Sequence, residues 1–128
     1  TDHAPHAEKD KPQGDMKKAA NGFSGFETAF SVCVTYLLKP GYLPLRDIAG
    51  KLSGSPRAVF GVKRVKIVEG EKAELTILDT GCVRGIESAS FLSMGKNSPY
   101  DGMTLCGDTR MTVNGDHIII KEEHGYVG

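Results

Sequence analysis

The sequence predicts a mixed fold in which helices come first and strands follow. Apolar residues recur at helical spacing up to about residue 60 and alternate with polar residues from residue 74 onward. An Asn-Gly pair at 114–115 then separates two alternating runs. This order is compatible with a single α+β domain or with the ends of two separate domains.

A first helix is predicted over residues 24–39. Ser24 and Glu27 form an S-x-x-E capping box, which would satisfy two free backbone N–H groups at the start of the helix. Pro40 and Gly41 would end it. The apolar stripe at helical spacing consists of Phe26, Ala29, Phe30, Cys33, Val34 and Leu37.

Two shorter helices are expected next, over residues 44–52 and 55–60. Pro44 suits the first turn of one, and Gly54 would end it. Ser55 would cap the other, with Pro56 at its first position.

Strands are predicted after residue 61. Residues 74–79 alternate well, and residues 82–86 are a second candidate. Residues 109–113 and 117–121 should form a β-hairpin, because the Asn-Gly pair between them favours a type I′ turn.

The composition excludes several classes of protein. The chain has 128 residues, with 16 basic and 16 acidic side chains and no net charge, which argues against a nucleic-acid binder or a polybasic membrane-surface protein. No apolar run approaches the ~20 residues that span a bilayer, and the first residues have no signal-peptide pattern. Three widely spaced cysteines do not suit a disulfide framework or a zinc ribbon, so buried free thiols in a reducing cytoplasm are expected.

Residues 1–22 are expected to form a long loop, a kind of segment that is often functional. The mixed charges at 8–11 are interpreted as solvent-exposed. The chain begins without Met on its most chemical segment, so we expect that an N-terminal portion is missing. His117, His124 and the aromatic turn at 97–100 are expected to have surface or structural roles.

The strongest chemical candidate is the segment that contains Asp2, His3 and His6. One carboxylate and two imidazoles can bind a metal or move protons near neutral pH, and Pro5 stiffens the chain before His6. Spacing alone leaves open that these groups are merely solvated or structural. Asn21 and Gly22 form a second candidate, which would either contact a ligand through the backbone or make a turn.

Taken together, these segments resemble the C-terminal part of dihydroorotase. The match rests first on Thr-Asp-His-Ala-Pro-His at 1–6 and Asn-Gly-Phe-Ser-Gly-Phe-Glu-Thr-Ala at 21–29. It continues in order through further family-like stretches at residues 36–41, 52–61, 73–79 and 97–107. His6 favours dihydroorotase over hydantoinases, dihydropyrimidinases and allantoinases, which share the Asp-His pair but carry other residues at that position.

The resemblance implies an α/β fold. Residues 1–61 would be the C-terminal end of a (β/α)8 barrel, comprising the end of its last strand, the site loop and the closing helices. Residues 62–128 would supply the C-terminal part of a composite β-sandwich domain. The departures at Pro44, Gly54-Ser55 and Glu74 lie away from the implied site.

The resemblance also implies zinc-dependent interconversion of L-dihydroorotate and N-carbamoyl-L-aspartate in pyrimidine biosynthesis. Asp2 would be a zinc ligand and the catalytic group that moves a proton between metal-bound hydroxide and the ring nitrogen. His6 would bind the substrate carboxylate, and Asn21 and Gly22 would contact substrate through backbone groups. The family's remaining ligands for one or two zinc ions, and its substrate-binding arginine, are not in this chain.

Several alternatives stay open. The chain would be inactive alone as the C-terminal portion of an active cytoplasmic enzyme, with the N-terminal remainder as its partner and a homodimer possible. It would otherwise be a non-catalytic scaffold partner of aspartate transcarbamoylase, another cyclic amidohydrolase of the hydantoinase or allantoinase type, or an independent α+β binding module. No nucleic-acid or membrane partner is expected.

Overall fold

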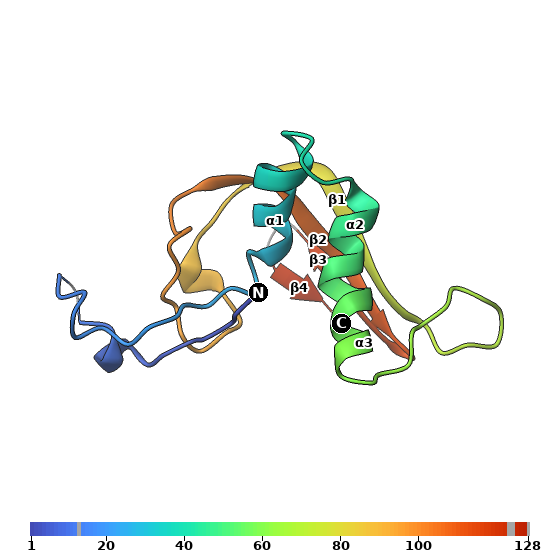
Figure 1. Ribbon diagram of the computed structural model, residues 1–128, viewed down its shortest axis with the longest axis horizontal. Helices are drawn as coiled ribbons and strands as arrows, with labels where there is room; N and C mark the ends of the chain where they lie inside the picture. The colour runs from blue at the N-terminus through green and yellow to red at the C-terminus, as the bar shows by residue number, and fades with distance from the viewer. Residues whose placement is uncertain (13, 123–124, 128) are drawn as a thin grey trace.

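The computed structural model describes residues 1–12, 14–122 and 125–127, and it has the predicted order of helices before strands (Figure 1). The loop at residues 1–22 contains a short 3-10 turn, Glu8–Asp10. Two helical segments follow, and a four-stranded antiparallel sheet completes the described chain. His117 is exposed, as predicted, whereas His124 lies outside the described residues.

The first helical segment begins later than predicted. It comprises α1 (Ala29–Cys33) and a π-helical continuation, Val34–Leu38. The predicted capping box is wrong, because both side chains bond to a distant loop at residues 93–95. The Ser24 hydroxyl donates to the Gly95 carbonyl, and the Glu27 carboxylate accepts from the Ser93 amide. Without that cap the helix starts only where its backbone can bond to itself.

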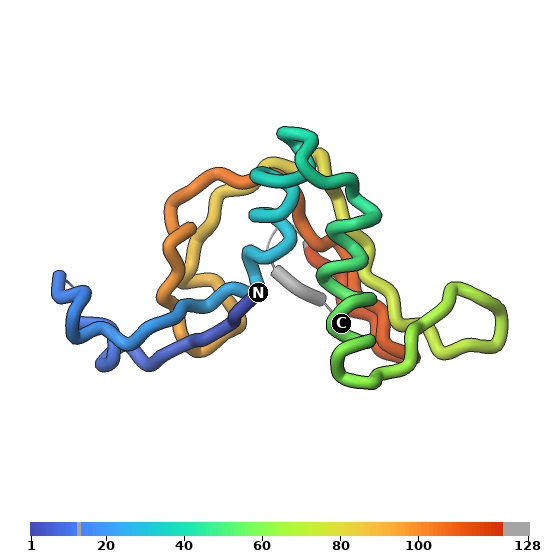
Figure 2. The backbone as a smooth tube through the Cα atoms, in the orientation of Figure 1, coloured from blue at the N-terminus to red at the C-terminus, as the bar shows by residue number. Residues whose placement is uncertain are grey.

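The second helical segment is continuous, so the predicted break at Gly54 and the predicted cap at Ser55 are wrong (Figure 2). It runs through α2 (Leu45–Ala49), a π-helical turn (Gly50–Gly54) and α3 (Ser55–Val59). Gly54 has helical angles, φ −63° and ψ −44°. The widened π-helical turn precedes Pro56, whose missing N–H would interrupt a regular α-helical ladder.

The sheet is a meander of β1 (Glu74–Gly85), β2 (Thr104–Asn114), β3 (His117–Glu122) and β4 (Gly125–Val127). The two strands predicted at 74–79 and 82–86 form one strand, β1, which pairs with β2 on both sides of an irregular stretch. The register shifts between Asp79 and Val83, and this irregularity explains why the sequence pattern breaks there.

The predicted hairpin is confirmed, but its turn lies one residue later than predicted. Asn114 pairs with His117, which leaves Gly115 and Asp116 as the two turn residues. Gly115 has a φ of 61°, whereas Asp2 is the only described non-glycine residue with a positive φ. A type I′ turn needs positive φ at both central positions, so the predicted turn type is wrong.

The α1 segment packs on β2 where the β1–β2 ladder is irregular. The Ser31 hydroxyl donates to the Gly107 carbonyl at 2.6 Å, and the Cys106 amide donates to the Thr35 hydroxyl at 2.8 Å. Helix side chains thus satisfy backbone groups of β2 near the register shift. Beside this contact lies a core of buried Ile86, Phe91 and Leu105, packed by Val32, Tyr100 and Met103.

One face of the sheet carries a cluster of apolar side chains that is only partly covered. The register places six side chains on it: Leu75, Ile77, Met111, Val113, Ile118 and Ile120. Ile77, Ile118 and Ile120 are 45%, 49% and 46% exposed. A face of this kind is suited to burial against another layer of structure.

The three cysteines are free thiols, as predicted, but each is half-buried rather than buried. Burial raises the pKa of the Cys33 thiol above its ordinary value, with a small opposing effect of the chain's amino terminus. The Cys33 thiol therefore stays protonated near neutral pH.

Candidate functional site

The candidate site is built from two neighbouring segments, residues 2–6 and 21–23. The Ala4 amide donates to the Phe23 carbonyl at 3.0 Å, and His3 and Phe23 form a parallel β-bridge. Phe23 also packs edge-on against Tyr100, with ring centroids 5.9 Å apart. Because Tyr100 contacts the buried core, this pairing connects residues 21–23 of the site to the core beside the sheet.

The structure brings together three of the four predicted site residues. His6 Nε2 lies 2.7 Å from the carbonyl oxygen of Asn21. A Cβ added at Gly22 would lie 2.5 Å from the Ala4 Cβ, so only glycine allows the two segments to approach this closely. His6 and the backbone of Asn21 and Gly22 therefore form one polar corner.

Asp2 lies at the start of the same segment, with an exposed side chain. Its φ of 47° is in the left-handed region, which aspartate tolerates better than most side chains. Non-glycine residues in this region often mark functional sites, where surrounding contacts hold them in place. Asp2 thus combines an exposed side chain with a backbone conformation that is uncommon outside glycine.

His3 has a structural role in this arrangement. Its Nδ1 accepts hydrogen bonds from the amides of Gly25 and Phe26 at 3.1 and 3.3 Å. Its ring stacks on Phe26, with centroids 3.8 Å apart and planes 7° from parallel. Since Nδ1 is an acceptor, the ring proton of the neutral form lies on Nε2.

Lys11 is a residue that sequence reasoning missed, because its charge seemed part of a solvent-exposed run. Its ammonium donates to the carbonyls of Ala20 and Gly22, the latter at 2.5 Å. These carbonyls flank Asn21, so Lys11 holds the second segment of the site in place through its backbone. No local pattern indicates this role, because the acceptors are backbone groups 9 and 11 residues away.

The described residues do not form a zinc site by themselves. No group of three or more His, Cys, Asp or Glu side chains among them is placed to hold a metal ion. A catalytic zinc usually takes three protein ligands and keeps one open position. Asp2 could supply one such ligand, and the described residues do not provide the others.

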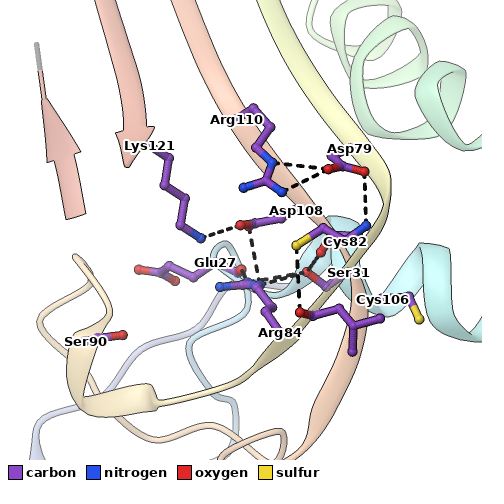
Figure 3. A network of polar contacts seen from close by, with 12 residues as sticks. Glu27, Ser31, Asp79, Cys82, Arg84, Ser90, Cys106, Asp108, Arg110 and Lys121 are labelled. Atoms are coloured by element: carbon purple, nitrogen blue, oxygen red, sulfur yellow. Dashed lines mark hydrogen bonds and ion pairs between the residues drawn. The ribbon is translucent and has the colours of Figure 1, made fainter. Parts of the chain in front are cut away.

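A second polar cluster on the sheet pairs three cations with two carboxylates (Figure 3). Asp108, which is 6% exposed, pairs with Arg84 at 3.4 Å and with Lys121 at 2.6 Å. Arg110 pairs with Asp79 at 2.9 Å. Arg84, Asp108, Arg110 and Lys121 line an open pocket of about 420 Å³. Because each cation faces a carboxylate, the cluster is suited to joining strands and helix rather than to binding an ion.

The same cluster connects to α1. Arg84 Nη2 donates to the Glu27 carbonyl at 2.6 Å, and its guanidinium also lies 3.4 Å from the Ser31 hydroxyl. The start of the helical segment is therefore fixed to the sheet by a charged side chain.

In the part of the chain that the structure describes, no helix is both long and apolar enough to cross a membrane.

The chain is similar to curated dihydroorotases. It is 39% identical over 123 residues to the dihydroorotase of Ruminiclostridium cellulolyticum, covering 96% of this chain and 28% of that protein. It is 39% identical over 127 residues to the dihydroorotase of Bacillus cytotoxicus, covering 99% of this chain and 29% of that protein. The chain thus spans less than a third of the length of these relatives, and no protein-family model matches it.

A solved structure gives the same indication. The fold resembles that of L-hydantoinase (dihydropyrimidinase) from Arthrobacter aurescens with a TM-score of 0.73 and 30% identity. The match covers 83% of this chain and 24% of the hydantoinase chain. Together with the small antiparallel sheet, this likeness fits the predicted α/β class. The resemblance indicated by the sequence motifs is confirmed: along almost its whole length, this chain is similar to dihydroorotases.

Proposed function

We propose that this chain is the C-terminal part of a zinc-dependent dihydroorotase of pyrimidine biosynthesis, acting in the cytoplasm. The longer polypeptide would interconvert L-dihydroorotate and N-carbamoyl-L-aspartate, and this chain alone would be inactive. The observation that supports the proposal most is the corner at which His6 meets the Asn21 carbonyl, 2.7 Å away, beside Gly22. The residues assigned to substrate binding are the ones that the fold brings together.

Each residue of the site has a distinct chemical task in this proposal. Hydrolysis breaks the C–N bond of the cyclic amide, adds the hydroxyl of water to the carbonyl carbon and delivers a proton to the nitrogen. Asp2 carries that proton, and in the reverse direction it removes it. His6 binds the carboxylate of the substrate, and the backbone at Asn21 and Gly22 contacts the rest of the molecule.

Zinc would be held mainly by residues outside this chain, with Asp2 as the one ligand from it. The cluster of ligands that a zinc ion needs is absent from the described residues, so the proposal requires the remainder of a longer polypeptide. That remainder is the chief partner in this proposal. A homodimer or a complex with aspartate transcarbamoylase would be a further level of assembly.

The proposed architecture assigns residues 1–61 to the end of a (β/α)8 barrel and residues 62–128 to a composite β-sandwich. The half-exposed apolar face of the sheet supports the second part, because Ile77, Ile118 and Ile120 would be buried by a facing sheet. The partly formed parallel pairing of His3 with Phe23 is compatible with the first part.

Steady-state kinetics of the complete gene product that carries this chain test the proposal. We expect turnover of L-dihydroorotate that a chelator abolishes, and a loss of roughly 10²- to 10⁴-fold in kcat for Asp2→Asn. The exposed Asp10→Asn is the matched control and should leave kcat unchanged. An inactive wild type, a fully active Asp2→Asn variant, or full activity of the isolated chain would each contradict the proposal.

The structural neighbour favours one second candidate, a hydantoinase-type cyclic amidohydrolase. The two candidates differ in the charge of the substrate, because dihydroorotate carries a carboxylate and a simple hydantoin does not. A higher kcat/KM for dihydroorotate than for a neutral 5-substituted hydantoin supports the first candidate. The reverse preference supports the second, and a failure to turn over either ring would favour a non-catalytic scaffold.

A further inference from the structure

A segment from the sheet half of the chain, residues 93–97, lies against the candidate site. We call it the strap. We propose that the strap is a positioning element that fixes the backbone of Pro5 and His6 and thereby orients the His6 imidazole toward substrate. This inference rests on the proposed function, because it assumes that His6 binds the substrate carboxylate.

The strap touches the site segment through backbone atoms. Gly95 is buried, and a Cβ added there would lie 2.9 Å from the His6 carbonyl oxygen and 2.9 Å from the Pro5 Cβ. The same Cβ would lie 3.1 Å from the His6 amide nitrogen. These distances are shorter than van der Waals contact, so any side chain at position 95 must displace the backbone of residues 5–6.

Two residues that follow the second site segment, Ser24 and Glu27, hold the strap in place. The Ser24 amide donates to the Asn97 carbonyl at 2.9 Å, and the Ser24 hydroxyl donates to the Gly95 carbonyl. The Ser93 amide donates to Glu27 Oε1 at 2.8 Å. Ser24 is fully buried, so its two hydrogen bonds are shielded from water.

These contacts make the strap a bridge between distant parts of the chain. The side chains of Ser24 and Glu27 bond to backbone groups of the strap that are 71 and 66 residues away. The strap therefore contacts both the stretch before α1 and the site segment, and the blue and gold stretches cross in Figure 1. If the strap moved at either contact, the backbone of His6, which lies against Gly95, would have to move with it.

The charge state of Glu27 is suited to this task. Burial raises the pKa of its carboxyl, but hydrogen bonds, chiefly with Ser93, together with the electrostatic effect of the nearby His3 outweigh burial, so the pKa lies below its ordinary value. The carboxylate consequently remains ionised near neutral pH and accepts the Ser93 amide in a charge-assisted hydrogen bond.

The test compares Gly95→Ala with Met94→Ala in the complete gene product. Met94 is 98% exposed and lies next to Gly95 in the strap, so its truncation is a matched control. We expect Gly95→Ala to raise KM for dihydroorotate by about fivefold or more, with a smaller change in kcat, because His6 acts in binding. Met94→Ala should leave both constants unchanged.

A second pair of variants keeps the test open if Gly95→Ala fails to fold. Glu27→Gln retains an oxygen that accepts the Ser93 amide, whereas Glu27→Ala removes it. KM should rise with Glu27→Ala and return close to the wild-type value with Glu27→Gln. A residue that only stabilised the fold would lower the melting temperature in Glu27→Ala without this split between KM and kcat.

A measurement independent of activity separates this inference from the proposed function. The NMR signals of the His6 ring and the hydrogen exchange of the Ala4 amide should change in Gly95→Ala or Glu27→Ala and not in Met94→Ala. Unchanged His6 and Ala4 signals in both variants would overturn the inference, whatever the enzyme does. An inactive wild type in which these signals do shift would contradict only the proposed function.

Discussion

His6 Nε2 lies 2.7 Å from the carbonyl oxygen of Asn21, so the imidazole is anchored to the segment that also contributes Gly22. Because Nε2 donates to that carbonyl, Nδ1 can donate to a ligand carboxylate only when the ring carries both protons. Such an anchor restricts the imidazole before substrate arrives, which reduces the entropy lost on binding.

Replacing His6 tests whether this imidazole binds the substrate carboxylate. A hydrogen bond to a charged group contributes about 1.5–3 kcal/mol, so His6→Gln should raise KM for dihydroorotate by roughly 10- to 150-fold. Steady-state kinetics measure this change. His117→Gln at an exposed position is the control, and equal KM values in both variants would rule out the assigned role.

Lys11→Met should loosen the second segment of the site. The substitution keeps an apolar stem but removes the ammonium that donates to the Ala20 and Gly22 carbonyls. We expect faster hydrogen exchange at residues 20–23, corresponding to about 1–3 kcal/mol of lost local stability. Mass spectrometry of exchanged peptides measures it, with the exposed Lys9→Met as control; identical exchange in the two variants would contradict the role of Lys11.

The sequence predicted best where structure depends on neighbouring residues. The hairpin at residues 109–121 was predictable because alternation is local, although its turn lies one residue later than predicted and is of another type. The start of the first helix was not predictable, because Ser24 and Glu27 form hydrogen bonds with residues that are 71 and 66 positions away, respectively. The helix through Gly54 was missed because glycine can either end a helix in the left-handed conformation or continue it. Gly54 has helical angles and continues the helix.

The candidate site shows the same division. Resemblance to a family indicated Asp2, His6, Asn21 and Gly22, but spacing alone left each of them open to a structural interpretation. Lys11 lay outside both kinds of reasoning, because backbone carbonyls leave no trace in the pattern of side chains. His3 had the residue type of a ligand, yet its Nδ1 accepts two backbone amides.

The ion pair of Asp79 and Arg110 predicts a dependence of stability on acid pH. The hydrogen bond from Arg110, together with the Gly81 and Cys82 amides, lowers the pKa of the Asp79 carboxyl. Because the folded-state pKa lies below the unfolded value, the pair stabilises the fold above about pH 4, and this contribution is lost as pH falls through the folded-state pKa.

Thermal unfolding of Asp79→Asn at about pH 7 and about pH 3 measures this effect. The wild type should lose melting temperature on acidification by more than the variant does, because asparagine does not titrate. Asp116→Asn, at an exposed turn position, should behave like the wild type. Parallel losses in Asp79→Asn and the wild type would show that the pair does not contribute to acid sensitivity.

Arg84 should be the most costly residue to remove from the polar cluster. Its guanidinium faces the buried Asp108 at 3.4 Å and donates to the Glu27 carbonyl at 2.6 Å. Arg84→Met leaves Asp108 with Lys121 alone, which we expect to cost about 2–4 kcal/mol of unfolding free energy. Arg46→Met is the control, since its side chain is 86% exposed and its surface pair should contribute at most about 1 kcal/mol.

A double-mutant cycle separates the ion pair from the other contacts of Arg84. In Arg84→Met/Asp108→Asn the buried carboxylate is gone, so the double variant should lose about 1–3 kcal/mol less than the sum of the single losses. Urea unfolding followed by circular dichroism gives all four free energies. Additive losses would mean that Arg84 does not act through Asp108. Arg84 would then act through its hydrogen bond to the Glu27 carbonyl, which fixes the stretch just before α1 to the sheet.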